Sequence, residues 1–134
     1  MLVAVVAAVA IGWLFARGDG TVRRGSWERI RPDQAGLPDD SFGPRGTLLL
    51  FTTPLDTRRD AARAVLAASV EREPGVWIAE VDLRARPALT GRFAVTRTPT
   101  VFVLDGDRRL RFRMKGVPKR TDLATALASV APPG

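Results

Sequence analysis

The residues best placed for chemistry lie in a loop at 54–59, between a short apolar run and a predicted helix. The loop contains Asp56, Thr57, Arg58 and Arg59. A strand–loop–helix unit of this kind can hold a reactive group at the positive end of a helix dipole. Here, however, no side chain is a nucleophile with an adjacent base. The loop has the position of a reactive site but lacks the usual reactive groups.

The amino-acid composition removes most catalytic chemistry. The chain of 134 residues contains no cysteine, no histidine and no tyrosine. Disulfides and thiol chemistry are therefore impossible, and the commonest general base and zinc ligand are missing. We expect no catalytic residue, no metal site and no cofactor.

Arginine dominates the charge of the chain. The formal net charge is +7, and among the basic residues only Lys115 and Lys119 are not arginine. Two interpretations remain open. One is a coding bias toward arginine and alanine, and the other is an anionic partner such as nucleic acid, a membrane or an acidic protein.

Residues 1–16, MLVAVVAAVAIGWLFA, contain no charged side chain. As a helix they would extend about 24 Å at 1.5 Å per residue, against a hydrocarbon core of about 30 Å. No basic residue precedes the run, and Trp13-Leu14-Phe15 stands where a signal peptide would have its small-x-small cleavage site. We interpret the segment as an uncleaved, single-pass transmembrane anchor. A buried N-terminal helix and an unusual signal peptide are the alternatives.

The charges that follow this segment predict its orientation. Basic residues concentrate on its C-terminal side, where arginines occur at positions 17, 23, 24, 29 and 31. By the positive-inside rule, the remainder of the chain is expected in the cytoplasm, attached to the cell membrane.

Glycine and proline divide the remaining chain into two parts. Residues 17–46 are rich in both and are expected to form a basic linker, with one short extended piece near 27–30. Residues 47–131 are expected to form the folded domain.

The hydrophobic patterns of this domain predict an α/β fold. Continuous apolar runs indicate strands buried on both faces, and apolar spacings of three and four indicate helices. Parallel pairing of the first two strands and a hairpin of the last two give a four-stranded mixed sheet with helices on both faces. Thr57 and Asp60 are expected to form a capping box. The strands are predicted at 47–51, 76–82, 100–104 and 108–115, and the helices at 56–71, 87–93 and 119–130.

This order of elements resembles the thioredoxin-like superfamily over about residues 45–131. One supporting feature is the strand–loop–helix unit at 47–71. Another is the segment VTRTPTVFV at 95–103, which resembles the family segment that opens the third strand with a cis-proline, and a third is Gly116. The arrangement also resembles membrane-tethered thioredoxin-domain proteins of high-GC bacteria. The resemblance implies a thioredoxin-like fold preceded by a transmembrane helix.

The chain departs from the family at the residues that perform its chemistry. The family's Cys-x-x-Cys motif falls on Asp56 and Arg59, with Thr57 and Arg58 between them. The family's reaction needs a thiolate stabilised by the helix N-terminus, and a carboxylate cannot exchange disulfides. The family's oxidoreductase activity is therefore not expected, and we predict that the protein is not an enzyme.

The resemblance nevertheless implies a binding surface. In the family, the cis-proline loop and the redox loop lie side by side and bind an extended peptide through backbone hydrogen bonds. An alternative is that Asp56 and Thr57 only cap the helix and Pro99 only shapes the fold. The predicted binding residues are Asp56, Thr57, Arg58, Arg59, Arg97, Thr98 and Pro99.

The last predicted strand carries a cationic face. Arg109, Arg111 and Arg113 alternate with apolar residues, which predicts a half-buried strand. We expect it at the edge of the sheet, where its charges discourage aggregation. Contact with a membrane surface is the next interpretation. Nucleic acid is disfavoured, because Phe112 points to the core face instead of lying exposed among the arginines.

Together these features predict a membrane-tethered, redox-inactive thioredoxin-like domain that binds a protein or peptide segment. A second hypothesis is a redox role that depends on the thiol of a partner or small molecule. A third is binding of an anionic surface, either membrane or nucleic acid.

Overall fold

The strand at the centre of the structure is β2 (Gly46–Thr52), in which every residue is buried. The computed structural model describes residues 21–132. In it β2 pairs in parallel with β3 (Val76–Asp82) and antiparallel with β4 (Thr100–Asp105), so both of its edges are hydrogen-bonded. A strand covered on both edges and both faces requires the uninterrupted apolar run that the sequence supplies.

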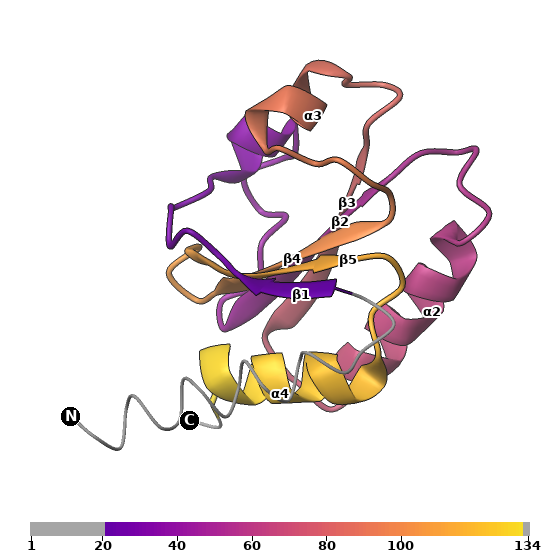
Figure 1. Ribbon diagram of the computed structural model, residues 1–134. Coiled ribbons are helices and arrows are strands. Elements are labelled where there is room, and N and C mark those ends of the chain that lie inside the picture. Colours follow the sequence, from indigo (N-terminus) through magenta and orange to yellow (C-terminus); the bar gives the residue numbers. More distant parts are fainter. Residues whose placement is uncertain (1–20, 133–134) are drawn as a thin grey trace.

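Strands β2, β3 and β4 belong to a larger mixed sheet that has helices on both faces (Figure 1). The sheet has five strands in the order β1-β5-β4-β2-β3. The predicted parallel pair and antiparallel hairpin are confirmed. The remaining elements are β1 (Thr21–Arg24), the 3-10 helix η1 (Pro32–Ala35), α2 (Arg59–Val70), α3 (Ala88–Arg92), β5 (Leu110–Lys115) and α4 (Arg120–Val130).

Two apolar cores separate the layers. Helices α2 and α4 cover one face of the sheet, where Leu66 and Leu123 are fully buried. Helix α3 lies on the opposite side (Figure 1). There the rings of Phe51, Phe93 and Phe102 meet with centroids 4.7 to 5.9 Å apart, distances typical of favourable aromatic contacts.

The prediction of four strands was wrong, because a fifth lies in the expected linker. Strand β1 pairs antiparallel with β5. The extended piece expected at 27–30 is reduced to a single bridge between Arg29 and Arg109. Ile30 and Phe42 are buried in the core on the α3 side. Residues 21–46 thus belong to the folded unit, because these scattered apolar residues bury themselves against the sheet despite the glycines and prolines around them.

The prediction that β5 is an edge strand was also wrong. Strand β1 pairs with the outer edge of β5. The arginines of the predicted strand contact other groups of the same chain. Arg109 donates to the Trp27 carbonyl oxygen at 3.0 Å, and Arg111 lies 3.9 Å from the centroid of the Trp27 ring. Arg113 donates to two backbone carbonyls and lies over Phe102.

The predicted transmembrane anchor, residues 1–16, lies outside the described residues. Between residues 21 and 132, none of the helices combines the length and the apolarity needed to cross a membrane.

Candidate functional site

The loop that opened the sequence analysis follows β2 and leads into α2. Asp56 forms the turn: its Oδ1 accepts a hydrogen bond from the Arg58 backbone amide at 2.9 Å, and its carbonyl accepts one from the Arg59 amide at 3.2 Å. The helix begins at Arg59 with Arg58 as its N-cap and without a side-chain capping bond. The predicted capping box of Thr57 and Asp60 is therefore wrong. Asp56 satisfies the turn instead, because its short side chain reaches the amide two residues ahead.

The Asp56 side chain is buried, with 7 % of its surface exposed. Burial raises the pKa of this carboxyl, but the Arg58 amide, the Thr98 side chain and the Arg58 guanidinium lower it by more, so the pKa lies below its usual range. Within residues 21–132, the second oxygen, Oδ2, is buried and has no hydrogen-bond partner. The carboxylate is therefore a charged group held by this loop and not a proton donor at neutral pH.

A second loop, at 95–99, lies against the first. The Thr98–Pro99 peptide bond is cis, as the resemblance implied. Arg58 Nη2 donates to the Thr98 carbonyl oxygen at 2.5 Å and joins the two loops. Pro99 is buried, whereas Arg97 is exposed. The cis-proline segment thus presents its backbone and the Arg97 side chain next to the loop that carries Asp56.

Between these loops the surface forms a groove with a volume of about 530 Å³. Leu83 and Val95 are buried beneath it, while Leu55 is 78 % exposed at its rim. The volume falls within the usual range for binding pockets, about 300–1,000 Å³. The groove is lined by Thr53, Leu55, Leu83, Arg84, Thr90, Val95, Thr96, Arg97 and Thr98.

Only part of the predicted site lines this groove. Arg97 and Thr98 do, and Arg97 also borders a second hollow with Arg58 and Lys119 near the start of α4. Thr57 is exposed. Arg59 is half-buried, and its charge contributes to lowering the pKa of Glu80. Of the seven predicted residues, only Arg97 and Thr98 line the groove. Asp56, Arg58 and Pro99 belong to the two joined loops without lining it. Thr57 and Arg59 do not line it either.

Sequence reasoning missed the apolar part of the groove. Leu55 stands as a lone apolar residue within a polar loop, a signal that could have identified it. Leu83 and Arg84 follow β3, and no local pattern connects them with 95–98. The sheet brings them together, because β3 is parallel to β2 and both strands end at the same edge.

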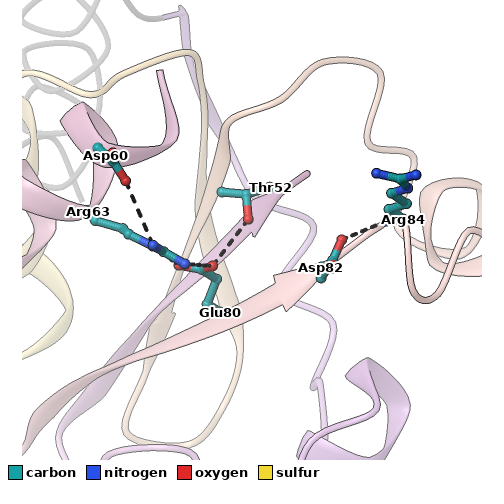
Figure 2. Close-up of polar contacts among 6 residues, drawn as sticks. All are labelled: Thr52, Asp60, Arg63, Glu80, Asp82 and Arg84. Carbon is teal, nitrogen blue, oxygen red and sulfur yellow. Dashed lines mark hydrogen bonds and ion pairs between the residues drawn. The ribbon is translucent and has the colours of Figure 1, made fainter. Parts of the chain in front are cut away.

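A polar cluster supports the loop from the side of β3. Arg63 of α2 donates through Nε and Nη2 to the two carboxylate oxygens of Glu80, at 2.7 and 2.6 Å. Figure 2 shows this pair, with Asp60 and Thr52 on either side of it. Hydrogen bonds from Arg63 are the largest cause lowering the pKa of Glu80, while partial burial opposes them. The pair joins α2 to the C-terminal part of β3, the strand that leads to the groove residues Leu83 and Arg84.

Metal-binding clusters and thiols are both absent from residues 21–132. Between residues 21 and 132 there is no cluster of three or more acidic, histidine or cysteine side chains able to hold a metal ion. The full sequence contains no cysteine. Without a thiol, this site cannot exchange disulfides.

Comparisons with known proteins bear on the fold. No protein-family model and no curated protein matches the sequence. Among solved structures, a designed protein is similar with 24 % identity and a TM-score of 0.57, over 74 % of this chain and 86 % of the other.

Several thioredoxins are similar with comparable TM-scores and lower sequence identity. A mutant thioredoxin from Halobacterium salinarum has 16 % identity and a TM-score of 0.58, covering 67 % of this chain and 78 % of its own. Mitochondrial thioredoxin 3 from Saccharomyces cerevisiae has 15 % identity and a TM-score of 0.55, covering 63 % and 78 %. At these identities the likeness concerns the fold alone. The chain has a thioredoxin-like α/β fold, and its sequence contains no cysteine.

Proposed function

We propose that this protein is a redox-inactive interaction module that binds an extended segment of another protein in the groove between the loops at 53–55 and 95–98. The observation that carries the proposal is the groove itself. It combines an exposed apolar rim at Leu55, a buried apolar floor and the cis-proline segment. No thiol is present that would convert binding into chemistry.

The hydrogen bonds at the cis-proline segment indicate how such a segment would be held. The Thr98 carbonyl oxygen already accepts a hydrogen bond from the Arg58 guanidinium. The Thr98 amide forms no hydrogen bond within residues 21–132. A bound backbone carbonyl can accept from this amide, while Leu55 and the floor receive an apolar side chain.

The positive charge of the groove selects among partners. Arg84 and Arg97 line it, and no carboxylate of residues 21–132 does. Segments carrying Asp or Glu beside an apolar residue therefore fit better than basic ones. Residues 1–16 would tether the domain to the cell membrane, with the domain on the cytoplasmic side. This part of the proposal is based on the apolar sequence and the arginines that follow it.

Affinity capture from a lysate of the native host tests the proposal. The bait is the full chain in detergent, compared with an Arg84→Glu/Arg97→Glu variant that reverses the charge of the groove. An Arg72→Glu/Arg120→Glu variant is the matched control, because these two arginines line a hollow between α2 and α4. A partner retained by the wild type and the control but lost by the groove variant supports the proposal. Equal recovery with all three baits contradicts it.

A further inference from the structure

A cationic hollow, separate from those described above, lies beside the segment at 94–96. It has a volume of about 450 Å³ and lies between β1, β5 and that segment. Among the described lining residues, Thr96 is the one common to this hollow and to the groove between the loops at 53–55 and 95–98. Among the described residues, no acidic side chain lines it. It is lined by Arg23, Arg24, Gly25, Ser26, Ala94, Thr96, Arg113 and Lys115.

The sheet register concentrates these charges. Arg23 of β1 lies directly opposite Arg113 of β5. Lys115 lies two residues further along β5 and therefore on the same face as Arg113. Like charges directly opposite one another on neighbouring strands destabilise a sheet. An anion placed among these three cations would remove that repulsion.

The described part of the chain supplies little compensating negative charge near these cations. Within residues 21–132, Arg23 and Lys115 take part in no ion pair. Burial lowers the pKa of Arg113 and the charge of Arg23 lowers it further, while only Glu28 raises it. Glu28, however, is paired with Arg92 at 3.4 Å. The Glu28 carboxylate is therefore the counter-charge of both Arg92 and Arg113.

The backbone around the hollow is fixed. Arg113 Nη2 donates to the Phe93 and Ala94 carbonyl oxygens at 2.7 and 2.8 Å, which holds its guanidinium against one wall. On the other wall, Gly25 passes so close to β5 that an added Cβ would overlap the Leu110 carbonyl oxygen. The hydroxyl-bearing residues Ser26 and Thr96 complete the lining.

We propose that this hollow binds the phosphate group of an anionic ligand. Guanidinium, ammonium and hydroxyl groups are the donors that phosphate oxygens accept most strongly, and arginine can donate two parallel bonds to them. The same phosphate chemistry occurs in an anionic phospholipid headgroup and in a soluble phosphate ester. Arg23 lies seven residues after the apolar segment 1–16, a distance of at most about 25 Å of extended chain. A headgroup would therefore be within reach of a tethered domain. The proposal does not depend on the peptide groove.

Acylation of lysine measures occupancy of this hollow, because the chain has only two lysines. Lys115 lines the hollow, and the exposed Lys119 lies outside it as an internal reference. The full chain in a maltoside detergent, which carries no phosphate, is treated with an amine-reactive ester and analysed by mass spectrometry. One arm adds glycerol 3-phosphate, with sodium chloride at equal ionic strength as its control. The other uses phosphatidylglycerol-containing vesicles, with pure phosphatidylcholine vesicles as the control.

The proposal predicts that acylation of Lys115 slows relative to that of Lys119, by about tenfold when the ligand is at ten times its dissociation constant. Protection in the phosphatidylglycerol arm alone identifies the ligand as a headgroup, and protection by glycerol 3-phosphate identifies a soluble ester. Arg23→Gln should remove the protection, whereas the matched Arg72→Gln should retain it, with circular dichroism confirming that both fold. Absence of selective protection in both arms, or equal protection in the Arg23→Gln variant, would overturn the proposal.

Discussion

Replacing Arg58 with alanine should loosen the joint between the two loops of the groove. Its guanidinium donates to the Thr98 carbonyl oxygen at 2.5 Å, and its Nε lies 3.7 Å from Asp56 Oδ1. The substitution leaves the Thr98 carbonyl without this donor. It also removes the positive charge beside a carboxylate that is 7 % exposed.

The magnitude follows from the two contacts. A hydrogen bond with a charged donor contributes about 1.5–3 kcal/mol, but the Arg58 side chain is 41 % exposed. Solvent screening therefore reduces the estimate, and an ion pair as long as the one with Asp56 adds little. We expect a loss of about 1–2 kcal/mol in the free energy of unfolding. For a domain of this size, each kcal/mol corresponds to a decrease of about 4–8 °C in Tm.

The pH dependence gives the prediction a second signature. Because the folded-state pKa of Asp56 is lowered, its ionised form stabilises the protein above the unfolded-state pKa, and this contribution is lost as pH falls through the folded-state pKa. Arg58→Ala raises the pKa of Asp56 toward its usual value. The difference in stability between wild type and variant should therefore be largest at neutral pH and shrink in acid.

Urea unfolding of the full chain, followed by tryptophan fluorescence, measures both effects. Arg59→Ala is the matched control, because it removes the same charge one residue away. The control should change stability by less than about 0.5 kcal/mol. If the two variants unfold at the same urea concentration, or if the Arg58 effect does not change with pH, the account of this joint is wrong.

Three further substitutions have defined outcomes. Glu80→Gln should cause a small loss of stability at neutral pH, because it weakens the hydrogen bonds from Arg63 that lower the pKa of Glu80. The loss should vanish in acid, where Glu80 is protonated. Urea unfolding at several pH values measures this loss, and a loss that does not change with pH argues against the Arg63–Glu80 pair. Gly25→Ala should cost about 1–3 kcal/mol, because its methyl group would overlap the Leu110 carbonyl oxygen; an unchanged Tm would refute this. Burial raises the pKa of Asp122, so the stability contributed by its protonated form is lost as pH rises through the folded-state pKa. Asp122→Asn should therefore be more stable than wild type at neutral pH and equal to it in strong acid, as urea unfolding at both pH values would measure. A destabilised variant at neutral pH would contradict this.

The sequence predicted well the elements whose apolar patterns are strong. Strand β3 (Val76–Asp82) has the predicted bounds, and α4 begins one residue later than predicted. Strand β1 was missed because TVRR has only one apolar residue, and its place depends on hydrogen bonds to β5. A short edge strand with exposed arginines carries no periodic signal that distinguishes it from a linker.

The candidate site was predicted only at its centre. Asp56, Arg58 and Thr98 meet because the strand–loop–helix unit and the cis-proline segment have recognisable sequences. The sequence did not predict that Leu83 and Arg84 line the groove, because only the folded chain brings them close to residues 95–98. The pairing of Arg23 with Arg113 likewise depends on a long-range register that no local spacing reveals.

Site-specific photo-crosslinking in the native host tests the central claim most directly. A photoreactive amino acid replaces Leu55 at the rim of the groove, and the control position is Trp77, which is also exposed but lies on β3 (Val76–Asp82), the far edge strand. We predict that Leu55 crosslinks to one extended segment of one partner protein, and that the added substitution Arg97→Glu suppresses this product. Crosslinks no more abundant than those from Trp77, or unaffected by Arg97→Glu, would contradict the account of the groove as a binding site.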